Sequence, residues 1–317
     1  EVKVLDIDGI SFRDLNKNNK LDRYEDYRLD NAQRVEDLIS QMTLEEKAGT
    51  LFHPPVTINP DWMFRLYSLF VDGGKLTESE IINQHINHFN LYGNPKPERL
   101  AKRLNSLQKI ASRSRLGIPV TISSDPIHEV PNGGGVASFS LDGFSKWPSQ
   151  LGLAASQNPS LVKQFAEIAR EEYLAVGIRT ALHPMADLAT EPRWARNFGT
   201  FGSDNVLSSK LTLAYMDGFQ GKTIDSQSVM TMVKHFPGGG PQENGLDPHL
   251  FSGRNQVYPG NMFDYHVKPF IDAINNNLAV IMPYYGITVN QTSENVAIGF
   301  NKDLSLIHIS EPTRRWS

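Results

Sequence analysis

Short apolar runs alternate along this chain with segments whose apolar residues recur at helical spacing. Mostly apolar runs of this length are typical of strands buried on both faces. They predict six strands, at residues 50–53, 88–93, 118–125, 177–182, 229–235 and 279–283. Helical spacing predicts helices between them, at residues 31–48, 97–114, 159–176, 207–220 and 267–275.

This alternation predicts an α/β fold, in which helices cover a parallel sheet. We expect a TIM-like (β/α) barrel. It would be incomplete, with about six of the eight β/α units of a closed barrel and without the last strands. Near the end of the first predicted helix, Thr43 is a plausible N-cap and Glu46 stands at the capping-box position.

Composition narrows the class of protein. The 317 residues include 31 Lys and Arg against 35 Asp and Glu, a net charge of -4, which gives no argument for binding nucleic acid. No apolar run is long enough for a membrane span. The absence of cysteine excludes disulfides and thiolate metal sites, and it fits a periplasmic or secreted bacterial protein. We expect its signal peptide to lie outside this chain.

Charged and polar side chains follow several predicted strands. Asp125 closes one strand, and Lys234 with His235 closes another. Because chemistry in (β/α) folds sits at the carboxyl ends of the strands, we expect these side chains to share a pocket with residues of the following loops. The candidate substrate-binding residues are Asp125, Arg193, Arg196, Lys234, His235, Met282 and Tyr285.

A carboxylate, several cations and aromatic rings together suit a neutral polyol. The carboxylate accepts from adjacent sugar hydroxyls, and the cations donate to others while keeping the carboxylate ionised. The rings of Trp194, Phe236 and Tyr284 would cover the C–H face of the sugar. The alternative is a set of ion pairs that brace loops, which suits a single residue better than the whole set.

Several motifs, in this order and spacing, resemble those of the family 3 glycoside hydrolases, in particular the bacterial β-glucosidase branch. The resemblance covers roughly residues 30–300. The motifs are Gly117–Val120 leading to Asp125, Glu191–Arg196, Phe201–Asp204, Lys234–Gly240 and Met282–Tyr285.

The resemblance implies an N-terminal TIM-like barrel domain that binds the non-reducing sugar of a β-glucoside or oligosaccharide. It places Asp125, Arg196, Lys234, His235 and Tyr285 in the glycone subsite, with Arg193 and Met282 adjacent. It implies no cofactor for catalysis.

The chain departs from the family pattern at a few positions. Ala195 replaces a glycine, Gly199 stands where many members carry glutamate, Ser203 replaces a common acidic residue, and His128-Glu129 stands where His-Gly is frequent. These departures leave the preferred sugar open, so a β-xylosidase or a β-N-acetylhexosaminidase is an alternative. A non-catalytic module that binds carbohydrate or calcium is another.

The family's mechanism implies a retaining, exo-acting β-glycosidase that hydrolyses terminal β-D-glucosyl residues with two carboxyl groups. The family's nucleophile lies in a Ser-Asp-Trp type segment, which this chain lacks, and its usual acid/base lies in a later domain. We expect the nucleophile beyond Asp303, and therefore an inactive polypeptide. Residues 304–317 resemble a translated sequencing adapter and are expected to be a non-native tail.

A second motif lies in the N-terminal extension, residues 1–30, which precedes the truncated barrel at residues 31–303. Asn19 replaces the glycine of the sharp turn, and asparagine tolerates left-handed geometry. The spacing of the oxygen ligands resembles an EF-hand loop and suggests a structural Ca²⁺ site. The alternative is a loop held by its own hydrogen bonds. The candidate metal ligands are Asp14, Asn16, Asn18, Asp22 and Glu25.

Overall fold

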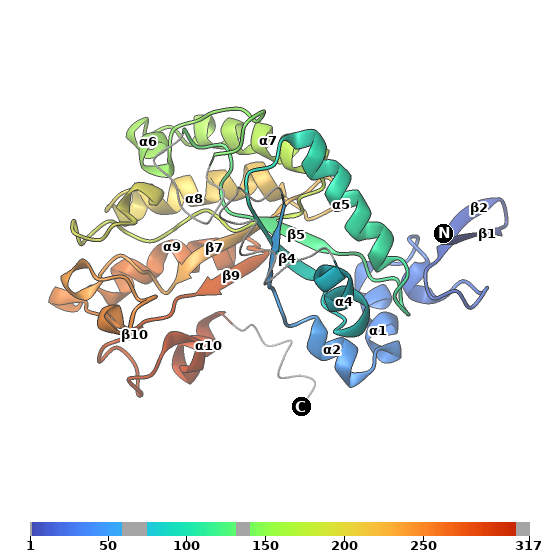
Figure 1. Cartoon of the computed structure of the whole chain (residues 1–317). Helices are drawn as coiled ribbons and strands as arrows, with labels where there is room; N and C mark the ends of the chain where they lie inside the picture. Colours follow the sequence, from blue (N-terminus) through green and yellow to red (C-terminus); the bar gives the residue numbers. More distant parts are fainter. Residues whose placement is uncertain (1, 59–74, 131–139, 309–317) are drawn as a thin grey trace. The chain divides into compact units, whose positions relative to one another are not determined.

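The computed structural model describes residues 2–58, 75–130 and 140–308 (Figure 1). The chain divides into two compact units. Unit 1 comprises Glu1–Asp125, Gly135–Gly143 and Ala175–Ile178. Unit 2 comprises Pro126–Gly134, Phe144–Leu174 and Arg179–Ser317.

Unit 1 begins with an antiparallel hairpin of β1 (Lys3–Ile7) and β2 (Ile10–Asp14), which the sequence analysis did not predict. A short 3-10 helix, η1 (Arg23–Glu25), then leads to α1 (Asn31–Gln41) and α2 (Leu44–Gly49).

The single helix predicted at residues 31–48 is therefore wrong, because the chain is extended at Met42 and Thr43. The predicted capping box is confirmed: the Thr43 hydroxyl accepts from the Glu46 N–H, and the Glu46 carboxylate accepts from the Thr43 N–H at 2.9 Å.

Three parallel strands form the sheet of unit 1: β3 (Pro55–Thr57), β4 (His88–Tyr92) and β5 (Thr121–Ser124). The strand predicted at residues 50–53 is wrong. The capping box starts a helix that ends at the C-cap Thr50, and the Phe52 N–H still donates to the Gly49 carbonyl, so the strand begins only at Pro55. Helix α4 (Lys75–Asn83) lies between β3 and β4 in the chain, and α5 (Pro97–Ala111) lies between β4 and β5.

Unit 2 contains β6 (Thr180–Ala181), β7 (Met230–Phe236) and β9 (Val280–Pro283), again all parallel. α8 (Asn205–Gln220) and α9 (Phe263–Asn275) lie side by side and both pack on β7 (Figure 1). The remaining elements are α6 (Gln150–Ala155), most of α7 (Pro159–Val176), α10 (Lys302–His308), the strands β8 (Asn255–Gln256) and β10 (Ile287–Thr288), and the 3-10 helices η2 (Asn197–Gly199), η3 (Glu243–Gly245), η4 (Phe251–Gly253), η5 (Pro259–Asn261) and η6 (Ile298–Phe300).

Strand order follows the chain within each unit, β3-β4-β5 and β6-β7-β9. These six parallel strands, alternating with helices, confirm the predicted α/β class and the count of six β/α units. Within the described residues, no helix combines the length and the apolar character that crossing a membrane requires.

The first residues of the predicted non-native tail continue α10. Leu304 is fully buried in the apolar core of unit 2. Residues 309–317 lie outside the described residues, so the non-native origin of the tail stays a prediction.

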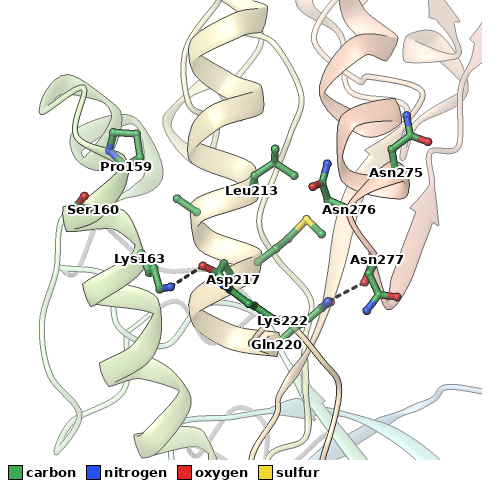
Figure 2. A pocket seen from close by; sticks show the side chains of 13 residues that line it. Pro159, Ser160, Lys163, Leu213, Asp217, Gln220, Lys222, Asn275, Asn276 and Asn277 are labelled. Atoms are coloured by element: carbon green, nitrogen blue, oxygen red, sulfur yellow. Dashed lines mark hydrogen bonds and ion pairs between the residues drawn. The ribbon is translucent and has the colours of Figure 1, made fainter.

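Gln220, the last residue of α8, joins this helix to the amino ends of β7 and β9. Its side-chain oxygen accepts from the Thr231 N–H and from the Ala279 N–H, each at 3.1 Å. Its amide donates to the Asn277 carbonyl at 3.0 Å (Figure 2). Since only 3% of Gln220 is exposed, water cannot readily replace these bonds.

We predict that Gln220→Met destabilises the chain by about 2–3 kcal/mol, because it leaves two backbone N–H groups without their acceptor. Urea unfolding followed by circular dichroism measures the change. Gln227→Met, at an exposed position, is the matched control and should change stability by less than about 0.5 kcal/mol. Equal stabilities of the two variants would contradict the role of Gln220.

Candidate functional site

Asp187, which the sequence analysis missed, organises the carboxyl end of β7. Its carboxylate is fully buried and lies 2.8 Å from the His235 Nδ1 atom. It also accepts from the His235 N–H at 3.1 Å and from the Gly239 N–H. Burial by itself would raise the pKa of Asp187, but His235 and these N–H groups hold that pKa below its ordinary value.

His235 is neutral at neutral pH. Burial lowers the pKa of His235 to about 4, although Asp187 acts in the opposite direction. A neutral imidazole that donates from Nδ1 to a carboxylate keeps Nε2 as an acceptor. The ring packs against Tyr284, with the two centroids 4.4 Å apart.

The glycine loop after β7 is tightly packed. A Cβ atom on Gly239 would lie 2.5 Å from the Tyr284 ring, and one on Gly240 would overlap the Leu188 carbonyl oxygen. Close backbone approach is thus the reason for glycine at both positions. The loop is therefore part of the scaffold that holds Asp187 and His235.

Three further predicted residues gather around His235. Lys234 is only 4% exposed, and Met282 of β9 stands opposite it in the register of the two strands. The positive charges of Arg196 and Lys234 both contribute to lowering the pKa of His235, after burial. The structure therefore brings Arg196, Lys234, His235 and Met282 together in unit 2.

Two predicted residues lie at more exposed positions of unit 2. The Arg193 side chain is 62% exposed and forms an ion pair with Glu191 at 2.8 Å, the bracing role that the alternative interpretation anticipated. Tyr285 is 56% exposed, and its ring lies nearly perpendicular to that of His249, with the two centroids 4.9 Å apart.

Asp125 belongs to unit 1, where it directly follows β5. In the same unit, the His53 Nε2 atom lies 2.7 Å from the Ser123 hydroxyl. Burial lowers the pKa of His53, whereas the charge of Asp125 raises it. Asp125 is thus close to a second histidine, which the sequence analysis did not include in the site.

A sequence signal for Asp187 existed. The segment from Thr180 to Leu188 is mostly apolar and carries a single carboxylate near its end, as does the strand that leads to Asp125. The sequence analysis identified residues 177–182 as the beginning of this strand and named no candidate residue between Leu182 and Glu191.

A cavity of about 590 Å³ lies between the ends of α7, α8 and α9 (Figure 2). None of the predicted site residues lines it. Because α8 and α9 precede β7 and β9, and Gln220 at the end of α8 accepts from the Thr231 and Ala279 N–H groups, the cavity lies at the amino ends of these strands. In (β/α) folds that edge serves stability, so the cavity is not the candidate active site.

The N-terminal loop closes on its own hydrogen bonds. The Glu25 carboxylate accepts from the Leu15 N–H at 2.6 Å and from the Asp22 N–H at 3.1 Å. The side-chain amides of Asn16 and Asn18 donate to Asp22 at 2.6 and 2.7 Å.

Asn19, with φ at +61°, adopts the left-handed conformation predicted for it. In the described part of the chain, no group of three or more His, Asp or Glu side chains is arranged to hold a metal ion. The oxygens of the predicted ligand set are instead engaged by hydrogen bonds of the loop.

Curated proteins with similar sequences include β-glucosidase C of Emericella nidulans, 49% identical over 86% of this chain and 43% of that protein. A periplasmic β-glucosidase/β-xylosidase of Dickeya chrysanthemi is 42% identical over 95% of this chain and 47% of its own length. The chain thus spans about half the length of these relatives.

Solved structures share the fold at lower identity. A β-glucosidase from Erythrobacter marinus has a TM-score of 0.65 and 24% identity, over 84% of this chain and 33% of its own. A mutant β-glucosidase from Listeria innocua in complex with laminaribiose has a TM-score of 0.65 and 23% identity, over 87% and 35%.

The N-terminal domain of glycosyl hydrolase family 3 matches residues 43–302. This match includes every predicted substrate-binding residue, from Asp125 to Tyr285. The chain therefore belongs to glycoside hydrolase family 3 and consists mainly of the family's N-terminal domain.

Proposed function

We propose that this chain supplies the glycone-binding part of a β-glucosidase-type enzyme. The whole protein would hydrolyse terminal β-D-glucosyl residues with retention of configuration. The observation that carries this proposal is the buried Asp187–His235 pair, which fixes an imidazole beside Lys234 at the carboxyl end of β7. The names of relatives that are 42–49% identical support the choice of sugar.

The side chains around His235 have hydrogen-bonding groups that suit a sugar. The Nε2 atom of His235 accepts a hydrogen bond from a sugar hydroxyl, and Lys234 and Arg196 donate to other hydroxyls. The Tyr284 ring supports the imidazole. Asp125 would accept from two adjacent hydroxyls, and Arg193, Met282 and Tyr285 would form the periphery of the subsite.

We propose further that this polypeptide alone does not hydrolyse glycosides. Retaining glycosidases need two carboxyl groups about 5–5.5 Å apart. Two aspartates of unit 2 have structural roles instead. Asp204 is the N-cap of α8, and its side chain accepts from the Leu207 N–H. Asp217 forms an ion pair with Lys163 at 2.5 Å.

A β-xyloside is the second candidate substrate, because the name of the Dickeya chrysanthemi relative includes both activities. The same name, and that of a periplasmic β-glucosidase of Salmonella typhimurium, 27% identical, support a periplasmic or exported protein. A β-N-acetylhexosaminide is a third candidate substrate, and comparing the affinities for different sugars in the binding test below would reveal it. A non-catalytic module that only binds carbohydrate or calcium is a further alternative.

We predict that the chain binds D-glucose and that Lys234→Met weakens this binding about tenfold or more, since a charged hydrogen bond contributes about 1.5–3 kcal/mol. Saturation-transfer NMR measures the dissociation constant. Lys222→Met, which removes a lysine at the distant cavity, is the matched control and should bind like the unaltered chain.

The same samples should release no nitrophenol from an aryl β-glucoside. Turnover at a rate typical of a glycosidase would contradict the proposed inactivity. Failure to bind glucose, xylose or N-acetylglucosamine would contradict the proposed subsite.

We also propose that the N-terminal loop binds a structural Ca²⁺ ion. The five candidate side chains converge: both asparagine amides reach Asp22, and Glu25 closes the loop from its twelfth position. Rotation of the two amides would turn their oxygens toward the position that the nitrogens now occupy. This exchange would convert the hydrogen-bonded loop into a set of oxygen ligands.

We predict that Ca²⁺ at one hundred times its dissociation constant stabilises the chain by about 2.7 kcal/mol. Differential scanning calorimetry with Ca²⁺, with Mg²⁺ and with a chelator measures this effect. Glu25→Gln should abolish it, whereas Asp8→Asn, in the exposed turn before the loop, should not. A melting temperature that is indifferent to Ca²⁺ would contradict the site.

A further inference from the structure

Gln150, a buried glutamine at the start of α6, bonds to the backbone beside the candidate site. Its side-chain amide donates to the Met185 carbonyl at 3.1 Å, and its side-chain oxygen accepts from the Met185 N–H at 2.9 Å. Only 4% of Gln150 is exposed, so water does not readily replace these bonds. One side chain therefore satisfies both backbone groups of Met185.

These two bonds fix Met185 on the side that faces away from β7. On the other side, the Lys234 N–H donates to the Pro184 carbonyl at 3.1 Å, and the Lys234 carbonyl accepts from the Ala186 N–H at 2.8 Å. Met185 and Lys234 thus form a parallel bridge. In such a ladder, the N–H and C=O groups of the residue between the two bonded ones point away from the partner strand. The Gln150 amide takes the place that the backbone of a further strand would occupy.

Met185 leads to the candidate site by two routes. Along the backbone, Asp187 follows two residues later, and its carboxylate accepts from the His235 ring and from the His235 N–H. Through its side chain, the Met185 sulfur accepts from the Arg196 guanidinium at 3.9 Å. The sulfur has little room to move, because a Cβ atom on Gly199 would lie 2.7 Å from it. A shift of the Met185 backbone would therefore displace both Asp187 and the contact with Arg196.

We propose that Gln150 is a positioning residue of the glycone subsite. Its amide holds the Met185 backbone, and this backbone holds the Asp187 carboxylate that orients His235. The inference rests on the proposed function, because the orientation of His235 affects binding only if a sugar occupies the subsite. The oxygen and the nitrogen of the Gln150 amide both bond to Met185, so Gln150 acts through this residue and not on the sugar.

Gln220 provides the comparison that separates positioning from stability. It too is a buried glutamine whose amide bonds to backbone groups, but it lies at the amino ends of the strands. Gln150→Met and Gln220→Met remove the same chemical group at the two opposite ends. Both should lower the melting temperature of the chain. Only Gln150→Met should disturb His235 and the binding of a sugar.

The first measurement is the affinity of the intact 317-residue chain for D-glucose, at pH 7 and at a temperature where every variant is folded. Gln150→Met should weaken binding about fivefold or more, the lower end of a typical coupling between sites. Gln220→Met should bind like the unaltered chain. Equal affinities of the unaltered chain and Gln150→Met, or equal losses in both variants, would overturn the positioning role.

The second measurement is rescue by Gln150→Glu. A protonated carboxyl group carries a donor and an acceptor, as the amide does, so it restores both bonds to Met185. An ionised carboxylate has no donor and faces the Met185 carbonyl. Because burial raises the pKa of a carboxyl group, the protonated form should predominate at pH 5. Gln150→Glu should therefore match the unaltered chain at pH 5 and bind glucose about fivefold or more weakly than it at pH 8.

This comparison is insensitive to native groups that titrate, because each variant is compared with the unaltered chain at the same pH. Glu129 is such a group, since burial raises its pKa to about 7. His235 stays neutral at both pH values, since burial lowers its pKa to about 4. Burial also lowers the pKa of His183 well below its ordinary value, so this histidine stays neutral as well. An equal loss of affinity at pH 5 and pH 8 would contradict the bonding role of the Gln150 amide.

The third measurement needs no sugar. The His235 Nδ1–H group, 2.8 Å from its acceptor on Asp187, should give a distinct proton–nitrogen NMR signal in a chain labelled at histidine. Loss of this signal in His235→Gln assigns it. Gln150→Met should shift or broaden the signal, whereas Gln220→Met should leave it unchanged. A signal that is unaffected by Gln150→Met would overturn the proposal.

The outcomes separate the two proposals. If the unaltered chain binds no glucose, the proposed function fails, and the His235 signal still decides whether Gln150 positions the Asp187–His235 pair. If the chain binds glucose but Gln150→Met changes neither the affinity nor the signal, only the role of Gln150 fails. Melting curves identify any variant that does not fold. Should Gln150→Met be such a variant, Gln150→Glu, which retains both bonds at pH 5, provides the test.

Discussion

The hydrogen bonds of the buried Asp187 carboxylate determine the geometry of the candidate site. An ionised carboxylate without water is costly unless hydrogen-bond donors surround it. Here the donors come from one short segment, the His235 ring, the His235 N–H and the Gly239 N–H. The end of β7 and the glycine loop must therefore close around Asp187. Closure fixes the imidazole against Tyr284 and requires residues without a side chain in the loop.

Two buried carboxyl groups of unit 2 show how partners decide protonation. Burial desolvates both groups and disfavours their charged forms. Asp187 has enough donors to stay ionised, whereas the Glu129 Oε2 atom has no hydrogen-bond partner among the described residues and burial raises the pKa of Glu129 to about 7. Asp187 is therefore a fixed part of the scaffold.

The amino and carboxyl ends of the strands in unit 2 have different roles. At the amino ends, Gln220 satisfies backbone groups of β7 and β9 and joins them to α8. At the carboxyl ends, Arg196, Lys234 and Met282 gather around His235. This division is the one expected for (β/α) folds, where stability and chemistry occupy opposite edges. It also explains why a sizeable cavity at the amino ends is unrelated to the predicted site.

The sequence by itself determined the features that depend on near neighbours. Helix α7 matches its predicted bounds, the Thr43 capping box forms as expected, and Lys234 and His235 end a buried strand. Periodicity, capping and strand ends are local properties, and the family motifs repeat them in order. Only the tertiary structure decided that Asp187 accepts hydrogen bonds from His235 and Gly239 and that Glu129 is buried. Burial and the identity of a partner distant in the sequence set the charge of these groups, and local pattern carries neither.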